Sequence, residues 1–220
     1  MKKIAILMAD LSGYTAWTAR HGAEAAASII DTYCRLVNDS LVGASEVCER
    51  VGDQVVVTSP NPNGVAATVV QLYKKTQDQH HFLPVHAGIH YGEILRREKF
   101  LFGSTINVCS RLATAAREGG ILCSSEFVYA LKDRRPYYFV RRGLKQFKNV
   151  FEQTDVMEFM PQGFSGKRVK LIDPVCHMQL EENEDHFRYR HRQHISHFCS
   201  IECMNVFQQT LHRKQSACLA

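Results

Sequence analysis

Short apolar runs alternate with longer stretches of helical spacing along the first three quarters of the chain. Runs of strand length lie at residues 4–9, 55–58, 85–90 and 137–140. Stretches with apolar residues three and four positions apart, the spacing of amphipathic helices, lie at residues 23–42 and 65–75. This order predicts an α+β fold with a ferredoxin-like βαββαβ core and extra strands.

The composition changes after residue 160. Residues 161–170 combine a proline, two glycines and polar side chains, which favours a linker. The linker would join a first domain, residues 1–160, to a small second module, residues 171–210, with a basic tail at residues 211–220. A chain of 220 residues is long enough for one medium domain and one small one.

Charge and cysteine content narrow the class of protein. The net charge is +5 with neutral histidines, and no sustained basic stripe with interleaved aromatic residues is present, so we expect no nucleic-acid partner. The N-terminal apolar run, residues 4–9, is too short for a secretion signal or a membrane span. Eight cysteines without such a signal indicate reduced thiols and a cytoplasmic location.

The first apolar run ends on a carboxylate. Asp10 follows this run directly and precedes a stretch rich in helix formers. Because an unpaired carboxylate is rarely buried in a core, Asp10 suits either a helix N-cap or a ligand of a hard cation such as Mg²⁺ or Mn²⁺. In the second case, Ser12 and the following backbone N–H groups are free to receive phosphate oxygens.

A second carboxylate stands between two predicted strands. Asp53 follows Gly52 and precedes a run of β-branched residues, and Gly-Asp at this place favours a tight hairpin. Asp53 would then lie at a loop tip, from which its side chain can reach outward. Asp10 and Asp53 could therefore share a pair of metal ions.

Further motifs follow in the third quarter of the chain. A Gly-rich strand at residues 85–93 leads to a glycine that precedes a helical stretch at residues 103–112. This stretch carries Asn107 and Arg111, which are one helical turn apart and project from the same face. Two further motifs follow, at residues 115–121 and 143–148.

Together with residues 9–15 and the Gly-Asp pair, these motifs resemble the class III adenylyl and guanylyl cyclases over about residues 1–160. The resemblance implies a nucleotidyl cyclase that converts ATP or GTP to the 3′,5′-cyclic monophosphate and pyrophosphate, in cyclic nucleotide signalling. Asp10 and Asp53 would hold two Mg²⁺ or Mn²⁺ ions, together with the backbone of Leu11. One ion would lower the pKa of the ribose 3′-OH and the other would bind the triphosphate.

The same resemblance assigns the other parts of the site. Phosphate binding falls to the residues at the start of the helical stretch, Ser12, Gly13, Tyr14 and Thr15. Asn107 would orient the ribose, and Arg111 would stabilise charge on the α-phosphoryl group. Lys145 would bind phosphate, although Gln146 follows it where the family has glycine.

In the family, the carboxylates of one subunit face the Asn and Arg of another across a head-to-tail dimer. One chain that carries both sets therefore predicts a homodimer with two equivalent sites and an inactive monomer.

The base-recognition positions depart from the family pattern. Glu49, four residues before Asp53, stands where guanylyl cyclases carry Glu and adenylyl cyclases carry Lys, and a carboxylate can accept hydrogen bonds from guanine. Phe100, seven before Asn107, replaces a polar residue and can only pack against the base. Together, Glu49 and Phe100 favour GTP as the substrate, and the alternative is relaxed selectivity between the two purine nucleotides.

The second module contains three cysteines at suggestive positions. Cys176 lies in a predicted β-turn, and Cys199 and Cys203, four residues apart, are predicted to share one face of a helix. These residues resemble the YHS domain, a short treble-clef-like module. Three converging thiols suit Zn²⁺ or another soft metal, whereas the alternative is that they are core residues. His177, where a glycine commonly stands, would add a fourth ligand or fill the turn. The other candidates for a fourth ligand are His186, His191, His194 and His197.

Three functions remain open at this point. The first is an active cyclase whose C-terminal module senses or requires a metal. The second is a catalytically inactive nucleotide- and metal-binding regulator with the cyclase fold, which Phe100 favours. The third is a module that receives and passes on a metal ion. Asp10, Asp53, Asn107 and Arg111 favour the first.

Overall fold

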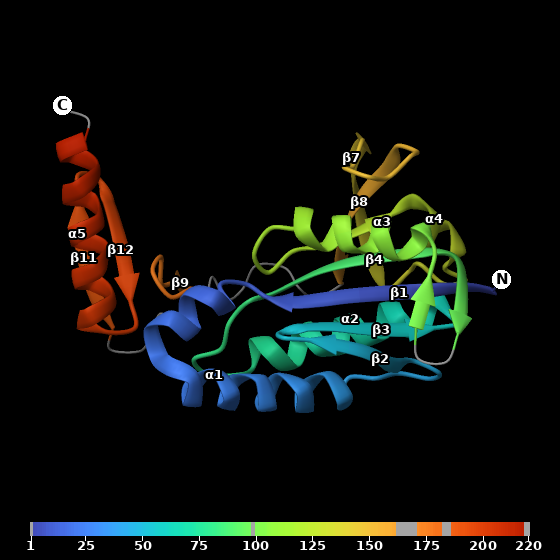
Figure 1. The fold of residues 1–220 in the computed structure, drawn as a ribbon, viewed down its shortest axis with the longest axis horizontal. Helices are drawn as coiled ribbons and strands as arrows, with labels where there is room; N and C mark the ends of the chain where they lie inside the picture. Colours follow the sequence, from blue (N-terminus) through green and yellow to red (C-terminus); the bar gives the residue numbers. More distant parts are fainter. Residues whose placement is uncertain (1, 98–99, 162–170, 182–185, 218–220) are drawn as a thin grey trace.

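A large antiparallel-rich sheet flanked by helices forms the body of the protein (Figure 1). The computed structural model describes residues 2–97, 100–161, 171–181 and 186–217. Its strands in this part of the chain are β1 (Lys2–Leu11), β2 (Glu46–Val51), β3 (Gln54–Ser59), β4 (Val85–Arg97), β5 (Phe100–Phe102), β6 (Ile121–Ser124), β7 (Tyr137–Lys145) and β8 (Thr154–Pro161). The helices are α1 (Tyr14–Asn38), α2 (Pro62–Gln77), α3 (Ser104–Ala115) and α4 (Ser125–Ala130).

The strand order confirms the predicted βαββαβ core. The sheet runs β2-β3-β1-β4-β6-β8-β7, and β5 pairs with β4. Neighbours among the first four strands are antiparallel, whereas β6 is parallel to β4. The order β2-β3-β1-β4, with helices after β1 and β3, is the ferredoxin-like arrangement. The remaining strands extend it on the β4 side.

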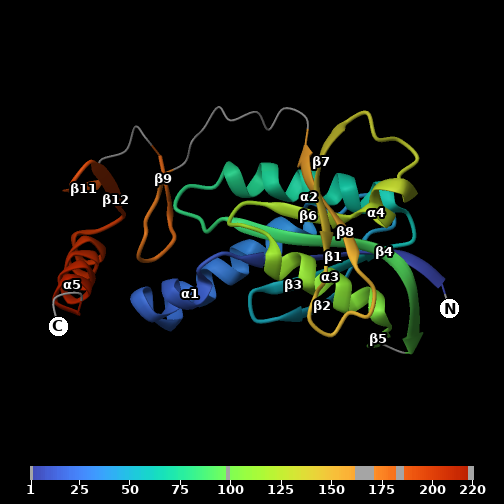
Figure 2. The same cartoon turned by 90° about the horizontal axis from the view of Figure 1, so that it is seen from above.

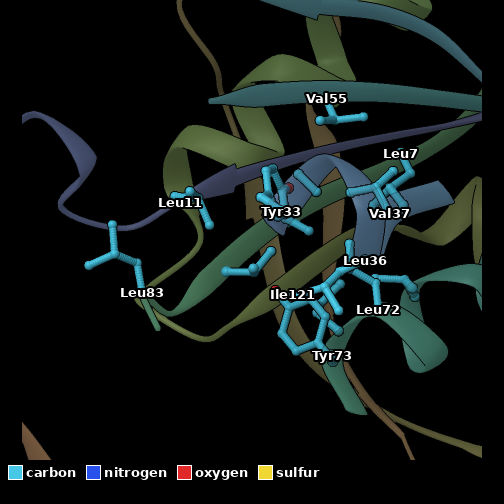
Figure 3. Close-up of a cluster of buried hydrophobic side chains, with 14 of the residues drawn as sticks. Leu7, Leu11, Tyr33, Leu36, Val37, Val55, Leu72, Tyr73, Leu83 and Ile121 are labelled. Carbon is cyan, nitrogen blue, oxygen red and sulfur yellow. The ribbon is translucent and has the colours of Figure 1, made fainter. Parts of the chain in front are cut away.

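The side chains of β1 alternate between two apolar layers. Ala5, Leu7, Ala9 and Leu11 face α1 and α2, and Figure 3 shows part of this layer around Tyr33. The residues between them face α3, where Ile6 and Met8 pack with Cys109 and Ala113. Period-two alternation along a strand produces this division. It puts Asp10, the next residue in the second series, on the α3 side of the sheet.

Helix α1 is kinked near its beginning. Gly22 has φ 82° and ψ 174°, outside the helical region, so residues 14–21 form a first segment and residues 23–38 a second one. The predicted helix at residues 23–42 thus begins correctly but ends four residues earlier, at Asn38. Gly22 adopts this positive φ because it lacks a Cβ.

The C-terminal part consists of two short hairpins and a helix. Its elements are β9 (Leu171–Ile172), β10 (Gln179–Leu180), β11 (Phe187–His191), β12 (His194–Phe198) and α5 (Ile201–Ala217). The predicted linker lies almost wholly outside the described residues. The predicted basic tail instead continues α5 as far as Ala217.

The C-terminal part packs against the first segment of α1 and the loop before β4. Figures 1 and 2 show it beside the N-terminal end of α1. Met178, Leu180 and Phe198 belong to the same buried cluster as the sheet and α1. The Gln179 N–H donates to the Phe82 carbonyl at 3.1 Å. Among the described helices, none is long and apolar enough to cross a membrane.

Candidate functional site

The two predicted metal carboxylates lie together at the end of β1. Ala9 pairs with Val55 across β1 and β3, which brings Asp10 beside the turn that joins β2 to β3. Gly52 takes a φ of 62° in this turn, and Asp53 follows it. The carboxyl groups of Asp10 and Asp53 share a hydrogen bond. The structure therefore brings together two side chains that are 43 positions apart in the sequence.

The electrostatics of this pair fit a divalent cation. Burial, followed by the hydrogen bond and the negative charge of Asp10, raises the pKa of Asp53 to about 7. The Leu11 N–H donates to Asp10 Oδ1 at 3.2 Å and so fixes this carboxylate. Two oxygen donors that repel each other are the ligand type that Mg²⁺ and Mn²⁺ prefer. A cation between them would take the place of the shared proton.

The loop after β1 differs in part from the expectation. Ser12 is 4% exposed; its N–H donates to the Pro84 carbonyl at 2.7 Å, and its hydroxyl pairs with His86 Nδ1 at 3.0 Å. The Ser12 N–H is therefore engaged within the fold, and its hydroxyl is positioned by His86. Gly13 is the N-cap residue of α1, with φ 78° and no side-chain capping hydrogen bond, while Tyr14 is half-buried and Thr15 exposed in the first turn.

A side chain from the C-terminal part covers this loop. A Cβ placed on Gly13 would lie 2.4 Å from both Cβ and Cγ of His177, so the imidazole rests directly on the glycine. His177 Nδ1 lies 2.5 Å from Glu118 Oε1, in the loop after α3. The sequence gives no sign of this contact. The contact places His177 at the predicted phosphate-binding position.

The other half of the predicted active site gathers around α3. Asn107 is exposed and Arg111 half-buried, one turn apart as expected. Arg111 Nε donates to the Lys148 carbonyl at 3.1 Å, in the loop that follows Lys145 at the end of β7. The structure thus places Arg111 beside the segment that carries the predicted phosphate-binding lysine.

One chain keeps the two halves apart. The Cys109 thiol, on the buried side of α3, donates to the carbonyl of Ile6, which lies about 13 Å along β1 from Asp10 at the usual rise of a strand. Asn107 stands on the exposed side of the same helix. Asp10 and Asn107 of one subunit therefore lie at different places along the sheet.

The two base-recognition residues also lie apart. Glu49 pairs with Val56, which pairs with Met8, so Glu49 projects from the same sheet face as Asp10. Phe100 pairs with Arg97 at the far end of β4 and is 64% exposed. Any site that uses both residues would need two chains.

The three cysteines of the C-terminal part converge. Sγ of Cys199 lies 3.4 Å from Sγ of Cys176 and 3.7 Å from Sγ of Cys203. Cys176 lies in a turn, as predicted, but Cys199 precedes α5, which begins at Ile201, so it does not share a helix face with Cys203. Burial raises the pKa of Cys203 to about 11, whereas the hydrogen bond from Cys176 lowers the pKa of Cys199.

A buried carboxylate organises this cluster. Asp173 is fully buried and accepts hydrogen bonds from the N–H groups of Val175 at 2.8 Å, Cys176 at 3.3 Å and Cys199 at 2.8 Å. It therefore holds the turn of Cys176 and the backbone of Cys199 in one arrangement. The Asp-Pro dipeptide at residues 173–174 was a turn signal that could have indicated this role.

The fourth member of the cluster comes from α1. A ring nitrogen of His21 and the three sulfur atoms all lie within 4.8 Å of one another. His177 occupies the turn with φ 61°, a conformation that suits glycine, and points to Gly13 instead. His186 and His197 pair with each other at 2.6 Å in the C-terminal hairpin, which also carries His191 and His194. None of these five predicted candidates belongs to the cluster among the described residues.

The fold and the placement of these side chains define a class III nucleotide cyclase architecture. Residues 1–160 match the adenylate and guanylate cyclase catalytic domain, and the chain belongs to this family. A pH-sensitive adenylate cyclase of Mycobacterium tuberculosis is 27% identical over 132 residues, 60% of this chain and 33% of that protein. An adenylate cyclase of Streptomyces coelicolor is 27% identical over 133 residues, 59% of this chain and 34% of that protein. The matched region spans about a third of these curated relatives.

Solved structures show the same fold. An adenylate cyclase of Trypanosoma brucei, solved in its monomeric state, superimposes with a TM-score of 0.68 at 16% identity, covering 76% of this chain and 91% of that one. The guanylate cyclase domain of a protein from Catenaria anguillulae, in complex with GTP, gives a TM-score of 0.60 at 13% identity, covering 73% and 97%. The expected mixed α+β cyclase fold is confirmed for the first domain.

Proposed function

We propose that the chain is a nucleotidyl cyclase that converts ATP or GTP to the 3′,5′-cyclic monophosphate and pyrophosphate. The observation that carries this proposal is the pair Asp10 and Asp53, which share a hydrogen bond at the end of β1 within the family-matched region. Two relatives named adenylate cyclase and a structural neighbour in complex with GTP support the substrate class. Its product would serve cyclic nucleotide signalling.

Each residue has a distinct task in this reaction. Two Mg²⁺ or Mn²⁺ ions held by Asp10, Asp53 and the backbone of Leu11 would supply charge neutralisation and an acidified 3′-OH. Arg111 stabilises the charge on the α-phosphoryl group, and Asn107 orients the ribose. The chain therefore provides position and electrostatic stabilisation rather than a covalent nucleophile.

The remaining predicted residues bind the triphosphate and the base. Gly13, Tyr14 and Thr15 offer the N-terminal end of α1 to phosphate, and Lys145 adds a cation. Glu49 would accept hydrogen bonds from guanine, whereas the relatives' names favour ATP. We therefore propose a purine nucleotide as the substrate and leave the base to the experiment below.

The active form would be a homodimer. The different places of Asp10 and Asn107 along the sheet of one chain support a second subunit that completes the site. Exposed apolar side chains lie on β5 and β7, among them Phe100, Phe102, Tyr138 and Leu144. Such side chains are costly to leave in water and suit an interface between subunits.

We further propose that residues 171–210 form a YHS-like, treble-clef-like module that binds Zn²⁺ or another soft metal. The convergence of Cys176, Cys199 and Cys203 supports this role. A module of this size buries little core and gains stability from a metal ion. This ion would be separate from the ions at the carboxylate pair.

Cyclic nucleotide production by the purified dimer tests the proposal. The protein is given Mn²⁺ with ATP or GTP in separate reactions, and we expect at least one cyclic product. Asp53→Ala should abolish turnover and leave the dimer intact, while Asp31→Ala, an exposed change on α1, should leave turnover unchanged. Turnover retained in Asp53→Ala would contradict the two-metal assignment.

The alternative is a catalytically inactive regulator that binds nucleotide and metal. Phe100, which cannot hydrogen-bond a base edge and is largely exposed, is the observation that favours it. If the dimer binds either nucleotide but cyclises neither, this function replaces the first.

A further inference from the structure

A histidine of the cyclase domain lies beside the cysteine cluster and carries a buried nitrogen without a hydrogen-bond partner among the described residues. This nitrogen is His21 Nε2. A buried polar atom without a partner destabilises a fold by about 1–3 kcal/mol, so such atoms call for an explanation. The sulfur atoms of Cys176, Cys199 and Cys203 lie within 4.8 Å of a His21 ring nitrogen.

The geometry of the four donors suits a tetrahedral ion. Zn–S bonds of about 2.3 Å place two sulfur ligands about 3.8 Å apart in a tetrahedron. The observed Sγ separations are 3.4 Å between Cys176 and Cys199, and 3.7 Å between Cys199 and Cys203. Three thiolates and one imidazole form a ligand set typical of structural zinc sites.

The surroundings hold these donors in place. Asp173 fixes the backbone of Cys176 and Cys199 through N–H groups. The ring of Trp17, one turn earlier on α1, lies 3.6 Å from the ring of His21, centroid to centroid. Partners of this kind orient metal ligands and limit the entropy lost on binding.

We infer that His21, Cys176, Cys199 and Cys203 form one Zn²⁺ site that fastens the C-terminal module to α1. The inference rests on the proposed metal-binding role of the cysteines and adds a ligand from the other part of the chain. Among the described residues, the module supplies three donors to the cluster and α1 supplies the fourth, so four-coordination draws on both parts.

The same ion would also affect the contact between His177 and Gly13, in the predicted phosphate-binding loop. His177 is the residue after Cys176, and its imidazole rests on Gly13 and pairs with Glu118. Binding of Zn²⁺ to Cys176 would fix this turn, and binding to His21 would fix the first segment of α1, which Gly13 precedes. Zn²⁺ binding should therefore stabilise the contact between His177 and Gly13.

Metal binding by the full chain tests the ligand set. Zn²⁺ is titrated under reducing conditions with excess Mg²⁺, and Co²⁺ is used as a visible probe. We expect one tightly bound ion per chain, with the Co²⁺ spectrum of tetrahedral thiolate coordination. His21→Ala should weaken Zn²⁺ binding at least about tenfold and alter that spectrum. The control His194→Ala, at an exposed position of β12, should change neither.

Hydrogen exchange tests the link to the loop. Zn²⁺ should slow amide exchange in residues 12–21 of the wild-type chain and of His194→Ala, but not in His21→Ala. Equal affinity, spectrum and protection in His21→Ala would overturn the inference and leave a site of three cysteines. Neither readout depends on nucleotide turnover, so an inactive cyclase would not affect the result.

Discussion

Two regions of the molecule each bring side chains of one chemical type close together, carboxylates in one and thiols in the other, and they do so by different structural means. Asp10 and Asp53 are oxygen donors from one sheet, and burial, followed by the hydrogen bond and the negative charge of Asp10, raises the pKa of Asp53 to about 7. Cys176, Cys199 and Cys203 are sulfur donors from a turn and the start of a helix, and they lie around a histidine from α1. The first group suits Mg²⁺ or Mn²⁺, and the second suits Zn²⁺.

The difference teaches where each site obtains its rigidity. The carboxylates lie on a strand and a hairpin whose register the large sheet determines. The thiols depend on hydrogen bonds to Asp173 and on contact with another part of the chain. The contact between His177 and Gly13 joins the two groups, so changes in one should reach the other.

The largest expected effect concerns the two halves of the proposed active site, the carboxylates at the end of β1 and Arg111 on α3. Arg111→Ala should lower turnover on the order of 100-fold or more because it removes charge stabilisation at the α-phosphoryl group. Asp53→Ala removes the other half-site. When equal amounts of the two inactive variants are mixed, about a quarter of wild-type turnover should return, since half the dimers then contain one intact site of two. No recovery in mixed dimers shown to form would contradict a shared site.

Next in size is the loss of the carboxylate that organises the thiol cluster. Asp173→Ala leaves the N–H groups of Val175, Cys176 and Cys199 without their acceptor and should destabilise the C-terminal part on the order of 3 kcal/mol. Asp173→Asn keeps one acceptor oxygen and should cost less. Thermal unfolding and Zn²⁺ content measure both, with the exposed Asp31→Ala as the control. Unchanged Zn²⁺ binding in Asp173→Ala would contradict its role.

A smaller effect tests the contact between the two regions. Gly13→Ala should destabilise the chain by about 1–2 kcal/mol, because φ is 78° and the new Cβ would overlap His177. His177→Gly removes the overlap and suits the φ of 61° at its own position. In a double-mutant cycle followed by thermal unfolding, the second change should recover part of the loss. Strictly additive effects would show that the two residues do not interact in solution.

The smallest expected effect is the release of protons when a metal ion binds to the carboxylate pair. Because the pKa of Asp53 is raised from 3.8 to about 7, the metal-free fold holds an extra proton in that range and loses the associated stability as the pH rises through 7. Binding of Mg²⁺ or Mn²⁺ should release nearly one proton at about pH 6 and almost none at about pH 8. Calorimetry in buffers of different ionisation enthalpy measures the release. Equal release at both pH values would contradict the shared proton.

Local patterns predicted most of the elements of the cyclase domain. The apolar run at residues 4–9 and the Gly-Asp pair at residues 52–53 located β1 and the β2–β3 turn, because strand periodicity and turn chemistry act between near neighbours. The end of α1 was missed by four residues, since tertiary packing decides where a helix stops. Cys199 was expected to share a helix with Cys203, but α5 begins at Ile201, for a similar reason.

The sequence by itself determined the family, the order of strands and helices, and the residue types of both candidate sites. Only the tertiary structure decided which distant residues complete them. His21 stands 155 positions before Cys176, and Ser12 meets Pro84 and His86 through the pairing of β1 with β4. Periodicity and motif spacing describe neighbours along a chain, whereas metal coordination and buried hydrogen bonds depend on distances that the whole packed fold determines.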